Sequence, residues 1–116
     1  MRRGDIHLVD FEPSQGSEVN KRRPAIVVSN DAANTYAERL GRGVLTFVPL
    51  TSTVRHIYPF QVLIPAERSG LPRDSKAQAE QVRAVDLERV GPRVGLVPLQ
   101  LMVSVDEALR IHLDLG

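Results

Sequence analysis

Short apolar segments, each ended by a polar loop rich in proline, glycine or serine, most limit what this chain can fold into. Segments of this length and β-branched content are typical of strands. The expected strands are 24–29, which is nearly all apolar as in a strand covered on both faces, and 5–11, 44–51, 60–64 and about 93–96. The loops are expected at 12–22, 52–58 and 65–75. No linker separates these segments, so residues 1–116 are expected to form one domain. Two separate hydrophobic cores would each be too small to be stable.

Two helices are expected beside these strands. Asn30 offers an N-cap for a short helix over 32–40, which two glycines close. Pro98 suits the first turn of a C-terminal helix. Apolar residues then recur at helical spacing, at Met102, Val105, Leu109 and Leu113. Residues 76–85 fit either a helix or a strand. The pattern predicts a mainly β (α+β) fold, a small barrel or curled sheet with a C-terminal helix and one or two short helices packed outside.

Composition and charge exclude several classes of protein. Lys plus Arg is 15 and Asp plus Glu is 14, for a formal net charge of +1. Both halves carry cations, whereas a protein that binds duplex DNA usually has a basic stripe, so any anion site is local. No apolar stretch approaches the roughly 18 residues of a membrane span, and the start lacks the apolar segment of a secretion signal. We therefore expect no membrane partner and a cytoplasmic location.

A metal or cofactor site is not expected. The chain has no cysteine, which rules out disulfides and sulfur-ligated metals. Its histidines, His7, His56 and His112, form no close pair. His7 is expected in a strand and His112 on a helix face, while the role of His56, in a polar loop beside Arg55, stays open. No glycine-rich phosphate-binding motif occurs either.

The run Lys21-Arg22-Arg23-Pro24 places cations where a polar loop meets an apolar strand. Arg23 precedes proline, so its backbone is biased towards an extended conformation. Pro24 can open a strand, because its missing N–H does least harm there. One interpretation is a guanidinium held at the entrance of a strand. The other is a solvated loop cluster.

Three hydroxyl residues, Thr51-Ser52-Thr53, follow the apolar strand 44–51 at its end. If this strand pairs antiparallel with 24–29, the start of one lies beside the end of the other, and Arg23 and Thr51 meet at one rim of the sheet. A guanidinium beside a hydroxyl suits an anion such as phosphate. By themselves, such serines and threonines more often form an ordinary turn.

Aromatic residues make up only 4% of the chain. Phe11, Phe47 and Phe60 lie in expected strands and are predicted to be in the core. Tyr58 flanks a loop, where it would either stack on a base or lie at the edge of the core.

Several short motifs follow one another along the chain. They are RRGDIHLVDFEP at 2–13, GSE at 16–18, RPAIVVSN at 23–30, VPLT at 48–51, RDS at 73–75, AEQVR at 79–83 and DEAL at 106–109. In this order they resemble the MazF/PemK family of toxin endoribonucleases over nearly the whole chain. The resemblance implies the SH3-like, PemK-type barrel with a C-terminal helix, and a strand for residues 76–85.

The resemblance also implies an activity. The family cleaves single-stranded RNA at short sequence motifs without a metal, through attack by the RNA's own 2′-OH, which leaves 2′,3′-cyclic phosphate and 5′-OH ends. Its conserved arginine and threonine match Arg23 and Thr51, which we assign to stabilising the transition state and to holding a phosphoryl oxygen. The base stays open between Glu18 and bound water.

Further residues are expected to contact RNA from the loops and from a strand facing the groove. They are Ser17, Glu18, Lys21, Arg22, Ser52, Thr53, Arg55, Tyr58, Glu80 and Gln81. The resemblance implies a homodimer and, as partner, a MazE-like antitoxin whose C-terminal segment occupies the same groove.

Two other functions use a similar barrel. One is a non-catalytic toxin that binds a protein such as DNA gyrase, and the other is an SH3-type interaction domain. The matching Arg23 and Thr51 favour the nuclease over the first, and the scarcity of aromatic residues counts against the second.

Overall fold

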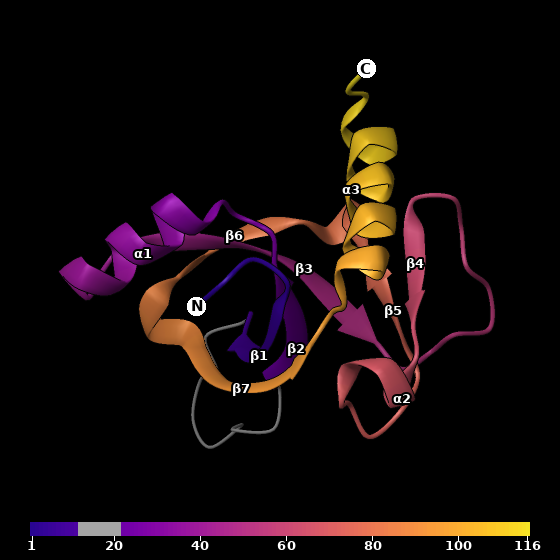
Figure 1. The fold of residues 1–116 in the computed structure, drawn as a ribbon, viewed down its shortest axis with the longest axis horizontal. Helices are drawn as coiled ribbons and strands as arrows, with labels where there is room; N and C mark the ends of the chain where they lie inside the picture. The colour runs from indigo at the N-terminus through magenta and orange to yellow at the C-terminus, as the bar shows by residue number, and fades with distance from the viewer. Residues whose placement is uncertain (12–21) are drawn as a thin grey trace.

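The computed structural model describes residues 1–11 and 22–116. Figure 1 shows a strongly curved sheet with helices outside it. Its strands are β1 (Asp5–Asp10), β2 (Arg22–Val27), β3 (Val44–Thr51), β4 (Gln61–Ile64), β5 (Ser75–Gln78), β6 (Arg83–Asp86) and β7 (Val90–Leu96). The helices are α1 (Asp31–Leu40), α2 (Ala66–Ser69) and α3 (Leu99–Leu113), with 3-10 turns η1 (Ala79–Gln81) and η2 (Leu87–Arg89). The predicted mainly β fold with a C-terminal helix is confirmed.

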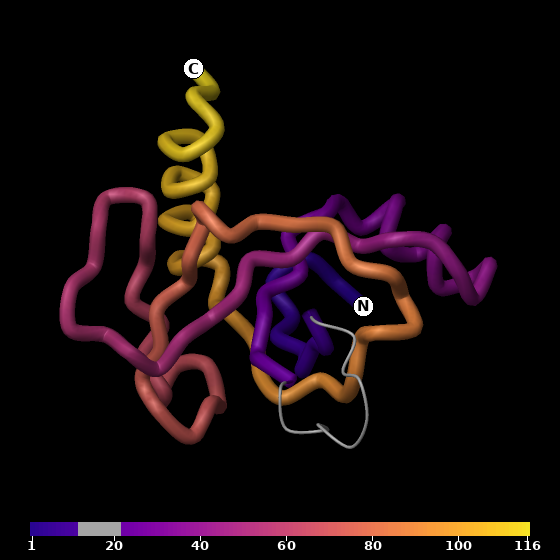
Figure 2. Tube along the Cα trace, turned by 180° about the vertical axis from the view of Figure 1, so that it is seen from behind, coloured from indigo at the N-terminus to yellow at the C-terminus, as the bar shows by residue number. Residues whose placement is uncertain are grey.

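The sheet is built around β3. Its order is β4-β5-β3-β2-β1-β7, all neighbours being antiparallel, and β6 pairs with β3 as well. The first half of β3 pairs with β6 and its last residues pair with β5, while β2 lies along its other edge. Figures 1 and 2 show α3 beside β4 and α1 at the other end of the molecule. The end of β3 is therefore where β2, β3 and β5 come together.

Both faces of the second half of β2 are buried, as its continuous apolar run predicts. Ile26 belongs to a cluster that packs under α3, with Ile6, Val48, Leu50, Ile64, Leu71, Ala77, Val97, Met102 and Val105. Ala25 and Val27 belong to a second cluster beside α1, with Val9, Phe11, Ala37, Leu45, Phe47 and Val85. Because successive strand residues point to opposite faces, β2 contributes to both clusters and holds the two parts of the core together.

Phe47 is the largest fully buried side chain. We expect Phe47→Ala to lower the free energy of unfolding by about 3–5 kcal/mol, because it removes apolar contacts and leaves a cavity. Urea denaturation followed by circular dichroism measures the change. Tyr36, which is 67% exposed on α1, is the control, and Tyr36→Ala should change stability by less than about 0.5 kcal/mol. Equal effects of the two substitutions would contradict this core assignment.

The helices form close to where the sequence predicts them. The Asn30 side chain caps α1 by accepting from Ala33 N at 2.8 Å, and Gly41 ends the helix at φ 67°. In α3, Met102 and Val105 are buried. Leu113 is 49% exposed, so the last position of the apolar pattern does not reach the core.

The prediction of one strand over residues 76–85 is wrong. β5 and β6 both pair with the same edge of β3, and η1 lies between them. From Phe47 to Leu50 β3 advances three residues, whereas its partners advance six, from Arg83 back to Ala77. The three extra residues are accommodated by η1. The predicted loop 65–75 likewise contains α2, and β2 begins two residues earlier than expected.

Candidate functional site

Three polar residues lie abreast at the end of β3. The β2–β3 register pairs Ala25 with Pro49, and its continuation places Arg23 opposite Thr51. On the other side, Thr51 is paired with Lys76 of β5. Directly opposite residues of antiparallel strands present their side chains on one face. We call this set, together with Gln78 two residues beyond Lys76, the polar row. The antiparallel pairing that brings Arg23 to Thr51 is as predicted.

The guanidinium of Arg23 is held across β3. Its Nη2 donates to the side-chain Oε1 of Gln78 at 2.9 Å and to the carbonyl oxygen of Leu50 at 3.4 Å. Arg23 is nevertheless exposed, and its Nε and Nη1 donate to no described residue. Two acceptors thus orient a planar cation that keeps donors for an incoming anion.

Thr51 is half-buried and turns the chain at the end of β3. Its Oγ1 accepts from the backbone N of Thr53 at 3.3 Å, which leaves the hydroxyl proton available as a donor. Ser52 and Thr53 are exposed. The ordinary turn and the anion-binding hydroxyl, which the sequence offers as alternatives, are therefore compatible at this position.

Lys76 is a member of the polar row that sequence reasoning missed. It is only 8% exposed, and its Nζ donates to the carbonyl oxygen of His56 at 2.7 Å. Among residues 1–11 and 22–116, no carboxylate forms an ion pair with it. If residues 76–78 had been assigned to a short strand of their own, the alternation of Lys76 and Gln78 would have indicated its polar face.

Tyr58 sits in a small aromatic group above the polar row. Its ring lies parallel to that of Phe60, with centroids 5.3 Å apart, and His56 meets it edge-on at 4.2 Å. Lys76 Nζ lies 5.9 Å from the Tyr58 centroid. Phe11 and Phe47 are in the core as predicted, but Phe60 is only half-buried. Phe60 lies in the turn just before β4, where it stacks on Tyr58.

Glu80 and Gln81 lie in η1 rather than on a strand. Glu80 Oε2 accepts from Gln61 Nε2 at 2.7 Å, while the buried Oε1 has no hydrogen-bond partner among the described residues. Gln61 is paired in turn with Gln78 of the polar row. Of the two carboxylate oxygens of Glu80, one is therefore bound to Gln61 and the other is buried. Gln81 is exposed.

The comparison with protein families agrees with this geometry. Residues 2–113 match the model described as "PemK-like, MazF-like toxin of type II toxin-antitoxin system". This chain belongs to the PemK-like, MazF-like toxin family. Because the match takes in nearly every residue of the chain, the fold and the polar row both fall inside the region that defines the family.

Individual relatives in the PemK-like family are similar along their whole length. "Endoribonuclease MazF9" of Mycobacterium tuberculosis is 55% identical over 115 residues, which cover 99% of this chain and 98% of the relative. "Endoribonuclease EndoA" of Bacillus subtilis is 33% identical, with 99% and 96% covered. A crystal structure of MazF from Deinococcus radiodurans has a TM-score of 0.75 at 27% identity, covering 98% of this chain and 96% of that one.

A second solved structure, an endoribonuclease in complex with its cognate antitoxin from a mycobacterial species, has a TM-score of 0.78. It covers 100% of this chain and 97% of the other, and at 22% identity it shows likeness of fold alone. The barrel of this PemK-like chain is thus shared with a protein solved together with its antitoxin.

Not every predicted RNA contact of this PemK-like chain joins the polar row. Ser17, Glu18 and Lys21 lie outside the described residues. Arg22 is next to Arg23 on β2 and so points to the other face, where its Nη1 lies against Gly91. Arg55 is exposed in the segment that carries Tyr58. His7 is in β1 as predicted, with its Nδ1 2.9 Å from Gly91 O.

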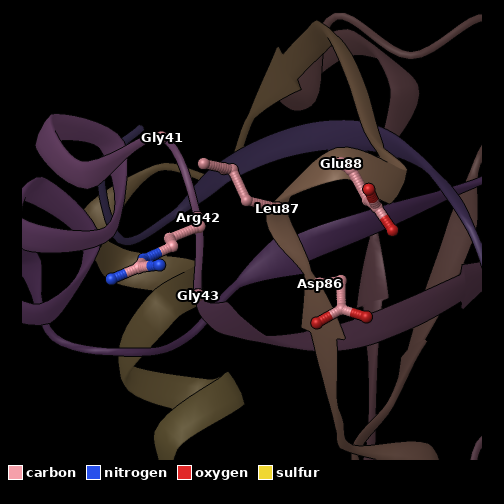
Figure 3. A pocket seen from close by; sticks show the side chains of 6 residues that line it. All are labelled: Gly41, Arg42, Gly43, Asp86, Leu87 and Glu88. Atoms are coloured by element: carbon pink, nitrogen blue, oxygen red, sulfur yellow. The ribbon is translucent and has the colours of Figure 1, made fainter.

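A hollow near α1 is a separate feature of this PemK-like chain (Figure 3). It has a volume of about 230 Å³ and lies at the start of β3, between Gly41, Arg42, Gly43 and the residues Asp86, Leu87 and Glu88. Figure 3 shows the two carboxylates on the side opposite Arg42. Carboxylates repel a polyanion, so this hollow does not suit RNA, and the polar row remains the candidate site.

Two further properties concern the described part of this PemK-like chain. None of its helices has the length and apolar character needed to cross a membrane. Its histidine, aspartate and glutamate side chains form no group of three or more that could hold a metal ion.

Proposed function

We propose that this chain is the endoribonuclease toxin of a type II toxin–antitoxin system and that it cleaves single-stranded RNA at the polar row. The observation that carries the proposal is the exposed Arg23 guanidinium, which two acceptors hold across the end of β3, where the strand register places Arg23 opposite Thr51. The names of the full-length relatives support it, since both are endoribonucleases. They also favour it over the gyrase-type alternative.

The proposed chemistry is an internal transfer. The 2′-oxygen of the nucleotide before the scissile bond forms a bond to phosphorus, and the bond from phosphorus to the 5′-oxygen breaks. The 2′ proton passes to a base, and the leaving oxygen receives a proton. The products are a 2′,3′-cyclic phosphate and a 5′-OH end. Because the nucleophile belongs to the RNA, the step requires no metal-bound hydroxide.

Arg23 and Thr51 act on the charge that develops in this step. A guanidinium stays protonated at any physiological pH, so Arg23 serves as a fixed positive donor rather than a base. Its Nε and Nη1, which donate to none of the described residues, and the Thr51 hydroxyl donate to the phosphoryl oxygens of the pentavalent centre. One preorganised donor of this kind is typically worth about 10²–10³ in rate. Glu18 and bound water remain the candidates for the base.

The bases of the RNA are read around the row. We assign Tyr58 to stacking on a base. Glu80 stays a proposed contact to a base edge, which requires its side chain to turn outward, because its Oε1 is buried and its Oε2 accepts from Gln61. Ser52, Thr53 and Arg55, which are exposed in the segment that follows β3, are proposed to contact the RNA as well. The remaining proposed contacts are Gln81, Arg22 and the undescribed Ser17, Glu18 and Lys21.

Partners follow from the same proposal. A MazE-like antitoxin blocks RNA by laying its C-terminal segment over the polar row. A homodimer is supported by three apolar side chains that lie exposed near the start of α3, Leu96 at 45%, Leu99 at 85% and Val103 at 68%. A toxin that cleaves cellular RNA acts in the cytoplasm, where we place this protein.

The direct test is to incubate the purified protein with a long single-stranded RNA in EDTA and to map both ends of each cut. We expect cleavage at a short recurring motif, with 2′,3′-cyclic phosphate on one end and 5′-OH on the other. Cuts that require added metal, or that leave 5′-phosphate, would overturn the proposed chemistry. Intact RNA combined with inhibition of DNA gyrase would favour the alternative toxin.

A further inference from the structure

Lys76 is a buried cation, and among the described residues its ammonium group has its hydrogen bond and its nearby aromatic ring in one segment of the chain. It is 8% exposed, although ammonium groups are costly to remove from water unless they gain strong partners. The hydrogen bond to the His56 carbonyl and the position near the Tyr58 ring both lie in residues 52–60. These residues have no helix or strand, and Figures 1 and 2 show the chain between β3 and β4 as a wide arc.

The far end of this segment is tied down separately. Tyr58 N donates to Gln61 Oε1 at 3.2 Å, and Gln61 N donates to Tyr58 O at 2.9 Å. Stacking on Phe60 orients the Tyr58 ring. Lys76 supplies the tie to the middle of the segment, and it does so from the strand residue paired with Thr51. The segment is therefore fixed to the same strand pair that carries the proposed reaction.

We propose that Lys76 is a positioning residue that holds residues 52–60, and with them Tyr58, at a set place above the polar row. This inference rests on the proposed function, and it follows that Lys76 determines which base is accepted beside the scissile phosphate. The base that stacks on Tyr58 binds to a ring that is already held in one orientation. The RNA therefore does not have to order the ring when it binds. Released from Lys76, the ring would accept several bases at similar affinity.

Tyrosine fluorescence tests the positioning without any RNA. The chain has no tryptophan and two tyrosines. Tyr36 is 67% exposed on α1, so Tyr36→Phe leaves Tyr58 as the single emitter in a folded protein. In this background we expect Lys76→Met, which keeps the stem and removes the charge and donors, to raise acrylamide quenching of Tyr58 about twofold, since exposed segments without tertiary contacts are more mobile. Arg39→Met on α1 is the control for loss of a cation and should leave quenching unchanged.

RNA cleavage tests the consequence for specificity. With full-length protein and a short RNA that contains one preferred site, we expect Lys76→Met to raise KM about tenfold. This is about the loss of affinity expected when the stacking of one base is lost. We expect kcat to change by less than about threefold, because a residue that only positions the bound base affects substrate binding and not the chemical step. Sequencing of cut ends in a mixed RNA should show a weaker base preference next to the cut. Lys76→Arg, which keeps charge and donors, should restore the preference.

Each result decides one point. Unchanged quenching together with an unchanged cut-site preference overturns the proposal. A loss of kcat with KM and preference intact also overturns it, because Lys76 would then touch the reacting phosphate. If Lys76→Met does not fold by circular dichroism, Lys76→Gln and Lys76→Arg carry the same comparison, and only the arginine variant should behave as wild type. Failure of the wild-type protein to cut RNA would refute the proposed function while leaving the quenching result to decide whether Lys76 positions Tyr58.

Discussion

Arg23→Ala is expected to lower the rate of RNA cleavage by about 10²–10³, the usual worth of one preorganised donor to a charged transition state. The fold should survive, because Arg23 is exposed and its two acceptors, Gln78 Oε1 and the Leu50 carbonyl, can bind water instead. Single-turnover cleavage of a short RNA in EDTA measures the loss, and the thermal midpoint checks the fold.

Two comparisons sharpen this result. Arg23→Lys keeps the charge but loses the planar guanidinium, whose several N–H donors can reach Gln78 and the phosphate at the same time. The cleavage rate of this variant should therefore lie between those of wild type and Arg23→Ala. Arg39→Ala, on α1 and away from the polar row, should cleave as fast as wild type. Full activity of Arg23→Ala would remove Arg23 from the mechanism, whatever the other variants do.

Thr51→Val is the second substitution with a large expected effect. It replaces the hydroxyl by a methyl group of similar size, so β3 and its pairing with Lys76 should persist while one donor is lost. We expect cleavage to slow by about 10² and growth inhibition on expression to disappear. Thr51→Ser restores the hydroxyl and should restore most of both.

The cellular readout separates the two toxin classes. If Thr51→Val abolishes cleavage of purified RNA yet remains lethal in cells, the barrel acts through protein binding, as the gyrase-type alternative requires. If it keeps full cleavage, the hydroxyl that matters belongs to Ser52 or Thr53, which follow at the same end of β3. The first outcome would contradict RNA cleavage as the cause of toxicity, and the second would contradict the assignment of Thr51.

The strand pairing behind the candidate site could be predicted because its signals are local. Arg23 is extended because proline follows it, and Thr51 ends an apolar strand whose partner is the next apolar run along the chain. The antiparallel pairing of β2 with β3 then brings the two together. The resemblance to a toxin family predicted the same pair, and the family match includes both residues.

Other features depend on the strand to which a residue is paired. Arg22 and Arg23 look equivalent in the sequence, but alternation along β2 sends one towards Gly91 and the other towards Gln78. Lys76 looks like a surface lysine until β5 sets it beside Thr51, under the 52–60 segment.

The amino-acid order alone therefore determined the short strands, the capped helices and the two chemical groups proposed to meet the phosphate, because apolar spacing, proline and capping residues act over a few positions. Tertiary structure alone decided the break of 76–85 into β5, η1 and β6, the burial of Lys76 and the stacking of Tyr58 on Phe60. These depend on contacts between segments distant in sequence, and no local propensity encodes which face of a strand such contacts will cover.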